Sequence, residues 1–139
     1  MVKKLLTSLL ILLALSVIGF NFVCASAKAE VKKEDGLIVY YFYAKPRCVS
    51  CQKIENYTKE AVESLNNSAV ELKTVNLDDP ENKHYYKDYG LYTKSVVLSK
   101  IKNGKEIEYK NLDKIWMKLG NEKEFKQYVT DEINKIMEK

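Results

Sequence analysis

The chain has 139 residues, 30% of them charged, and its formal net charge at pH 7 is +4. This length predicts one domain, and a single histidine with three cysteines leaves few side chains for a metal site. Lys3 and Lys4 contribute two of the positive charges, and the remaining lysines alternate with acidic residues. Because the charges are mixed along the chain and form no basic stripe, we expect no nucleic-acid binding.

The first part of the chain has the pattern of an export or membrane segment. Lys3 and Lys4 precede an almost wholly apolar run that extends to about residue 25. Ala25-Ser26-Ala27 is the small-residue pattern of a signal-peptidase site, which predicts cleavage before Lys28 and removal of Cys24. The run is also long enough to cross a bilayer as an uncleaved anchor, and both interpretations stay open. Either one places the folded part outside the cytoplasmic membrane, as a secreted, periplasmic or anchored protein.

We therefore divide the chain into three parts: a signal peptide or membrane anchor at 1–27, a linker at 28–36 and one folded domain at 37–139. The linker is polar and charged. The domain has roughly a hundred residues, which is enough for one modest hydrophobic core. If the N-terminal segment is kept, it is the part of the protein that contacts the membrane.

The domain begins with a predicted strand at about 37–43, where the near-continuous apolar run is typical of a strand buried on both faces. An amphipathic helix at about 48–65 follows. A second strand at about 70–77 changes the phase of its alternation near its middle, which predicts a bulge or full burial. Asp79 and Pro80 then begin a helix as its N-cap and first residue, and Gly90 ends it.

A hairpin follows in the second half of the domain. Strands at 95–101 and 106–109 flank Asn103-Gly104, which is a strong turn signal. A short helix is expected near 112–119, with Gly120 at its end.

Asn121 begins the last helix as its N-cap, and Glu124 three positions later completes a pattern similar to a capping box. The buried face of this helix is expected to carry six residues: Phe125, Tyr128, Val129, Ile133, Ile136 and Met137. The whole order is β-α-β-α-β-β-α. It predicts an α/β fold with a four-stranded mixed sheet flanked by helices.

The chemistry of the chain centres on Cys48-Val49-Ser50-Cys51, between the first strand and the first helix. Cysteines with this spacing in this context are typical of a thiol–disulfide redox pair, whereas a structural disulfide across so short a loop restricts the unfolded chain little. Lys45-Pro46-Arg47 precedes the pair, and its two cations favour a thiolate on Cys48, as does the helix N-terminus. We predict Cys48 as the exposed nucleophile and Cys51 as the buried resolving thiol.

A second use of the same two thiols stays open. Thiolates bind soft metals and metalloids such as trivalent arsenic, so the pair can also serve a non-catalytic binding subunit of a membrane complex. A structural zinc site needs four ligands, and Cys48, Cys51 and His84 are too few once Cys24 is removed.

Two further groups of side chains have no assigned role. We expect His84 to be exposed to solvent. Four tyrosines are expected in the core or its rim, with an exposed docking patch as the alternative: Tyr85, Tyr86, Tyr89 and Tyr92.

The segment Tyr40 to Cys51, YYFYAKPRCVSC, resembles the active-site strand and loop of the thioredoxin superfamily, and Lys87 to Glu106 is similar to the segment that enters its hairpin. Residues 37–135 more closely resemble one branch, the thioredoxin-like subunit family named for nitrophenyl-compound nitroreductases. That family is often linked to arsenic-resistance operons. The segments that carry this closer resemblance include CQKIENYTKEAV and LGNEKEFKQYVTDEI.

The resemblance implies the minimal thioredoxin fold and an extracytoplasmic thiol–disulfide oxidoreductase. Its redox-active disulfide needs no diffusible cofactor. The implied partner is a protein disulfide or dithiol, including a polytopic membrane protein of the kind that passes electrons across the bilayer.

Two positions depart from ordinary thioredoxins. Alignment on Gly90 places Ser95 where the superfamily has a cis-proline facing the disulfide. A cis bond before a non-proline residue costs about 2.5–4 kcal/mol, so we expect a trans bond, with Ser95 within contact distance of Cys48. The buried acid of the central strand in thioredoxins aligns with Phe42, which predicts weak general-base assistance to Cys51.

Overall fold

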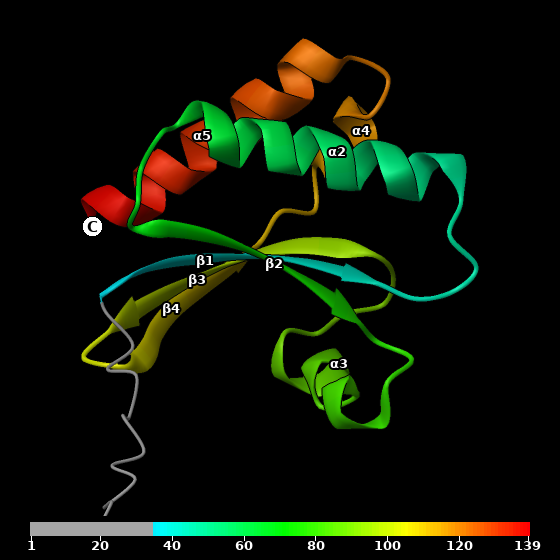
Figure 1. Cartoon of the computed structure of the whole chain (residues 1–139), viewed down its shortest axis with the longest axis horizontal. Helices are drawn as coiled ribbons and strands as arrows, with labels where there is room; N and C mark the ends of the chain where they lie inside the picture. Colours follow the sequence, from blue (N-terminus) through cyan, green and yellow to red (C-terminus); the bar gives the residue numbers. More distant parts are fainter. Residues whose placement is uncertain (1–34) are drawn as a thin grey trace, which may run out of the picture. The chain divides into compact units, whose positions relative to one another are not determined.

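The computed structural model describes residues 35–139, so the proposed signal segment and most of the linker lie outside the described residues. No helix in this part of the chain is long and apolar enough to cross a membrane. Figure 1 shows one sheet with helices against both of its faces. The elements in chain order are β1 (Gly36–Tyr43), α2 (Val49–Ser64), β2 (Val70–Asn76), the 3-10 helix η2 (Pro80–Asn82), α3 (Tyr85–Asp88), β3 (Ser95–Lys102), β4 (Lys105–Asn111), α4 (Ile115–Lys118) and α5 (Glu122–Glu138).

The four strands form one mixed sheet in the order β2-β1-β3-β4. β1 pairs in parallel with β2 and antiparallel with β3, and β3 pairs antiparallel with β4. The parallel pair is joined by α2, because parallel neighbours need a crossover connection. β1 lies in the interior of the sheet, and its six middle residues are all buried. The predicted α/β fold and the predicted burial of this strand are confirmed.

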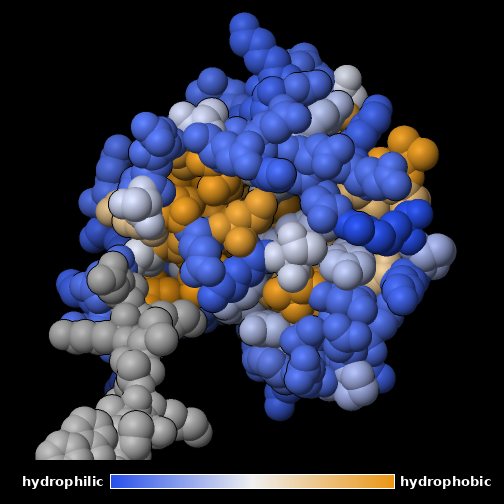
Figure 2. All heavy atoms as spheres, in the orientation of Figure 1, coloured by the Kyte–Doolittle hydropathy of each residue, from blue (hydrophilic) through white to orange (hydrophobic). Residues whose placement is uncertain are grey.

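The sheet separates two hydrophobic cores, because neighbouring side chains of a strand point to opposite faces. Leu37, Val39 and Tyr41 pack with residues of α2 and α5 on one face. Ile38, Tyr40 and Phe42 pack on the other face, where η2 and α3 lie. Figure 2 shows hydrophobic side chains between the sheet and the helices, and mainly hydrophilic ones over the outer helix surfaces.

Local signals in the sequence explain how several elements begin and end. Asn103 and Gly104 have φ values of 52° and 74°, the left-handed pair that a tight hairpin turn requires. The Asn121 side chain accepts a hydrogen bond of 3.2 Å from the Glu124 N–H and begins α5, as predicted. Gly90, with φ of 58°, follows α3 and ends the helical segment.

Two expected elements differ from the structure. β2 keeps an unbroken register with β1, and only Val70 is buried, so the strand has neither a bulge nor full burial. Its changed alternation is tolerated because β2 is an edge strand. The helix expected from Asp79 to Gly90 is divided into η2 and α3. The Asp79 carboxylate makes no capping bond and instead accepts one of 3.0 Å from Asn76 Nδ2.

The four tyrosines near α3 do not form one exposed patch. Tyr85 and Tyr89 pack against Tyr40, with ring centroids 5.8 and 6.1 Å away. Tyr86 and Tyr92 are exposed, and Tyr92 is 96% accessible. Tyr89 therefore belongs to the core and Tyr85 to its rim, because the short α3 covers this face of the sheet.

Replacing Ile133 by Ala should destabilise the fold strongly. Ile133 is fully buried between α5 and the sheet, so its removal loses apolar burial and leaves a cavity, at a cost of about 2–5 kcal/mol. Ile107→Ala removes the same atoms from a side chain that is 55% exposed and should cost less than about 1 kcal/mol. Urea unfolding measures both, and equal losses would contradict the assigned core.

Glu132 should make stability depend on acid pH. Its buried carboxylate in α5 accepts hydrogen bonds from Lys110 and Lys135, and the Lys110 bond is the main cause that lowers its pKa. A carboxyl group whose pKa is lower in the folded state stabilises the protein above its unfolded pKa of about 4.3. This stabilisation is lost as the pH falls through the folded-state pKa.

Glu132→Gln should therefore be less stable than the parent at pH 7, and the two unfolding free energies should converge as the pH falls below about 4. The measurement is urea unfolding between pH 7 and pH 3. Glu138→Gln, at the exposed end of the same helix, serves as the control. A constant difference across this pH range would show that the Glu132 carboxylate does not contribute through its charge.

Candidate redox site

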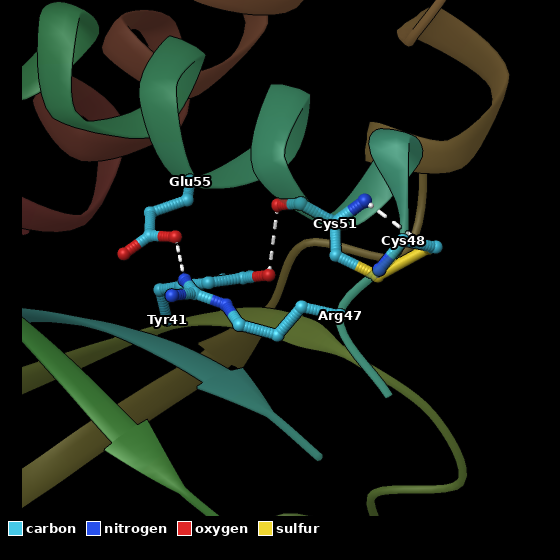
Figure 3. A network of polar contacts seen from close by, with 5 residues as sticks. All are labelled: Tyr41, Arg47, Cys48, Cys51 and Glu55. Atoms are coloured by element: carbon cyan, nitrogen blue, oxygen red, sulfur yellow. Dashed lines mark hydrogen bonds and ion pairs between the residues drawn. A yellow bond between two sulfur atoms is a disulfide. The ribbon is translucent and has the colours of Figure 1, made fainter. Parts of the chain in front are cut away.

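The site lies where β1 ends and α2 begins. β1 ends at Tyr43, a four-residue loop follows, and Cys48 is the N-cap of α2. Cys48 and Cys51 form a disulfide, with their Cα atoms 5.0 Å apart. The two cysteines meet because three residues along a helix make nearly one turn, which brings the N-cap sulfur next to the third helical residue. Figure 3 shows this disulfide at the first turn of α2.

The two cysteines differ in exposure, as expected. Cys48 is exposed, whereas Cys51 is 0% accessible. Their positions on α2 explain the difference in exposure, because Cys51 lies on the buried face of the helix with Ile54, whereas Cys48 is the N-cap. A reagent from solvent therefore meets the sulfur of Cys48 first.

At the start of α2, the two sulfur atoms accept the capping hydrogen bonds from backbone N–H groups. The Cys51 N–H donates to Cys48 Sγ at 3.4 Å, and the Cys48 N–H donates to Cys51 Sγ at 3.1 Å. In most helices a Ser, Thr, Asp or Asn oxygen accepts the first of these bonds. When the disulfide opens, this N–H group and the helix dipole favour negative charge on Cys48 Sγ.

The Arg47 cation in the loop before Cys48 is engaged by a carboxylate and an aromatic ring. The Arg47 guanidinium forms an ion pair with Glu55 of α2 and lies 4.6 Å from the centroid of the Tyr43 ring. Figure 3 shows this side chain running away from the disulfide to meet Glu55. The Lys45 backbone N–H donates to Asp78 Oδ2 at 2.7 Å. Direct support of the Cys48 thiolate by these cations stays a prediction.

Sequence reasoning did not include Glu55. The available signal was its spacing, four residues after Cys51, which places both residues on one side of α2. Such a spacing occurs in every helix and did not by itself indicate a pairing with Arg47.

Tyr41 is the β1 residue that contacts Cys51. It is fully buried, and its hydroxyl donates a hydrogen bond of 2.9 Å to the Cys51 carbonyl oxygen. Burial raises the pKa of Tyr41, while the nearby Arg47 charge partly opposes the shift. Tyr41 therefore stays protonated at neutral pH and acts there as a hydrogen-bond donor.

Phe42 lies on the other side of the sheet. It packs with Tyr85 and Tyr89, at centroid distances of 5.0 and 5.7 Å, in the core opposite α2. By sequence, Phe42 aligns with the buried acid of thioredoxins. In the structure, the residue beneath Cys51 is Tyr41, because strand side chains alternate and the loop length decides which of the two faces α2.

Ser95 begins β3 at the end of the sheet next to the cysteine loop, where it pairs with Phe42. Among residues 35–139 the one cis peptide bond precedes Pro46, so the bond before Ser95 is trans, as predicted. Ser95 is buried, and its hydroxyl donates to the Thr93 carbonyl oxygen at 2.9 Å. Its contact with Cys48 stays a prediction.

The other candidate ligand residues lie away from this pair. His84 is exposed, and its Nδ1 lies 2.7 Å from Asp88 Oδ2. Within the described part of the chain, no three His, Cys, Asp or Glu side chains gather in a group that could hold a metal ion. Cys24 lies outside the described residues.

No family model and no curated protein matches the chain. Among solved structures, it is similar to a thioredoxin from Trypanosoma brucei brucei, with 20% identity over 75% of this chain and 80% of that one and a TM-score of 0.46. It is also similar to Fasciola hepatica thioredoxin, with 23% identity over 71% of this chain and 83% of that one and a TM-score of 0.45. Because these scores are low, the fold assignment rests on the strand order and connections described above.

Those connections define a thioredoxin-like α/β fold with a disulfide-bonded CxxC pair at its strand–helix junction. This combination supports thiol–disulfide redox chemistry, because an exposed sulfur and a buried sulfur can exchange one bond between them.

Removal of the Tyr41 hydroxyl should weaken the connection between β1 and α2. Tyr41→Phe keeps the ring but loses a buried hydrogen bond, at a cost of about 0.5–1.5 kcal/mol. Tyr43→Phe is the matched control, since the Tyr43 hydroxyl makes no hydrogen bond to another described residue. Urea unfolding of the oxidised proteins measures both, and an equal effect of the two changes would show that the Tyr41 bond contributes nothing.

Proposed function

We propose that this protein is an extracytoplasmic thiol–disulfide oxidoreductase in which Cys48 is the nucleophile and Cys51 the resolving thiol. The observation that carries the proposal is the pairing of an exposed Cys48 at a helix N-cap with a fully buried Cys51. The exposed Cys48 can meet a protein substrate, whereas Cys51 is shielded from solvent and its sulfur is bonded to Cys48.

In the reducing direction the dithiol supplies two electrons. The Cys48 thiolate attacks one sulfur of a substrate disulfide, a mixed disulfide forms, and the other substrate sulfur leaves as a thiolate that takes up a proton. Cys51 then loses its proton and attacks Cys48 Sγ. The substrate is released as a dithiol, and the Cys48–Cys51 disulfide remains. An external dithiol must reduce this disulfide before the next cycle, and the oxidising direction is the same sequence reversed.

The residues near Cys51 affect the step in which Cys51 loses its proton and attacks Cys48 Sγ. The side chain that contacts Cys51 from β1 is a protonated tyrosine and not a carboxylate. In this proposal the proton of Cys51 passes to water or to the leaving substrate thiolate. Ser95 would border the bound substrate, and Lys45, Pro46 and Arg47 would shape the approach to Cys48.

The donor we propose is a polytopic membrane protein that passes electrons across the bilayer. Two features of the sequence support this proposal: the apolar N-terminal segment, and the resemblance of residues 37–135 to the subunit family named for nitrophenyl-compound nitroreductases. The reduction potential of the Cys48–Cys51 pair decides the direction of electron flow, since reductants and oxidants of this type differ by about 150 mV.

The central test is the reactivity of each cysteine by itself. In Cys51→Ser, Cys48 should be alkylated rapidly and at a midpoint pH below the usual cysteine value of about 8.5. In Cys48→Ser, the buried Cys51 should be alkylated slowly. Alkylation rate against pH, read by mass spectrometry, measures both. Faster alkylation of Cys51, or alkylation at a lower pH, would reverse the assigned roles.

The same variants separate exchange from ligand binding. Cys51→Ser should accumulate mixed disulfides with protein partners, whereas Cys48→Ser should accumulate none. Reduction of a model disulfide by the parent protein is measured in parallel. Stoichiometric binding of arsenite by the parent, without turnover of any disulfide, would instead identify a metalloid-binding subunit.

A further inference from the structure

The cation closest in sequence to the redox site is paired with an anion from the second turn of α2. Arg47 immediately precedes Cys48, and its guanidinium forms an ion pair with the Glu55 carboxylate. The pair is partly shielded from water, with side-chain accessibilities of 39% for Arg47 and 27% for Glu55. The Tyr43 ring packs against the guanidinium at 4.6 Å and helps to hold it in place.

This pairing has an electrostatic consequence for Cys48. A lone arginine beside a cysteine raises its thiolate fraction, because the cation favours the charged form. A carboxylate in contact with that arginine cancels most of its field at distances greater than the separation of the two charges. Figure 3 shows the two charged groups meeting on the side of Arg47 that points away from the disulfide, so Cys48 faces a nearly neutral pair.

We propose that Glu55 neutralises Arg47 beside the redox site and thereby limits the thiolate fraction of Cys48. Glu55 and Arg47 act here as tuning residues, because their described contacts are with each other and with Tyr43 and not with either sulfur. The inference rests on the proposed function, since it concerns the acidity of its nucleophile.

Other polar groups also lie around the site. Tyr41 of β1 stays protonated at neutral pH, and its hydroxyl is engaged by the Cys51 carbonyl oxygen. Asp78, which follows β2, accepts a hydrogen bond from the Lys45 backbone N–H, which places the Asp78 carboxylate beside the loop that leads to Cys48. The positions of the N–H groups at the start of α2 are set by the helix backbone, so neither Glu55→Gln nor Arg47→Met removes one of these groups.

The proposal predicts opposite effects for the two partners. In the full chain carrying Cys51→Ser, Glu55→Gln should expose the arginine charge and raise the thiolate fraction of Cys48 about two- to threefold below its titration midpoint. Arg47→Met should expose the Glu55 charge and lower that fraction by a similar factor. The double variant should return close to the starting value. The measurement is the rate of Cys48 alkylation against pH, with peptide mapping to separate Cys48 from Cys24.

Three controls make the result specific. Lys59→Met and Glu63→Gln alter an exposed ion pair further along α2 and should leave the alkylation profile unchanged. Arg47→Lys keeps the charge and should stay near the parent. The shift caused by Glu55→Gln should shrink in 0.5 M NaCl, because salt screens charges separated by more than about 4 Å at that ionic strength.

The outcomes separate this inference from the proposed function. Shifts of the same sign in both single variants, or no shift in either, would overturn the electrostatic assignment, and the far-ultraviolet circular dichroism of each variant identifies a loss of fold. Should Glu55→Gln fail to fold, the opposite shift of Arg47→Met and its suppression by salt decide the question. Alkylation requires no disulfide substrate, so these shifts can be present in a protein that lacks exchange activity.

Discussion

The burial of β1 on both faces is the constraint on which the rest of the structure depends, because a strand without a solvent face needs a helix layer on each side. α2 and α5 cover Leu37, Val39 and Tyr41, and α3 with its flanking turns covers Ile38, Tyr40 and Phe42. The chain leaves β1 at Tyr43 and must turn sharply to enter α2 above the same strand. That turn presents the cysteine pair beyond the C-terminal end of β1, with Cys48 exposed to solvent and Cys51 against the core.

The redox pair is also the N-terminal cap of α2, so its chemistry and the start of the helix are linked. Each cysteine N–H donates to the sulfur of the other residue. These bonds persist best when a sulfur carries negative charge, since a thiolate is a stronger acceptor than a disulfide sulfur. The helix end therefore provides part of the stabilisation that a thiolate at Cys48 needs.

The charges near the pair are balanced rather than one-sided. Arg47, which by sequence alone is a simple activating cation, is matched by Glu55. Beneath Cys51 the strand offers a tyrosine hydroxyl and no carboxylate. The ion pair and the tyrosine contact both follow from the packing of α2 over β1. The helix places Glu55 next to the loop, and the alternation of side chains along β1 places Tyr41 on the face that α2 covers.

The sequence by itself determined the α/β fold, the positions of the strands and long helices, and the redox pair. These depend on short-range features: an apolar run for β1, helical spacing in α2 and α5, the Asn103-Gly104 turn and the two-residue spacing of the cysteines. The trans bond before Ser95 and the difference in exposure between Cys48 and Cys51 were also predictable, from the intrinsic cost of a cis bond and from helix periodicity.

Only the tertiary structure decided which residues meet across elements. Whether Tyr41 or Phe42 lies beneath Cys51 depends on the path of the loop, and a shift of one residue reverses the two faces of a strand. The division of the helix after Asp79 and the packing of Tyr85 and Tyr89 against β1 depend on how one short segment covers a sheet face. The Arg47–Glu55 pair depends on where α2 lies relative to the loop. The sequence contains many acidic side chains, and only the packing of the elements decides which of them meets Arg47.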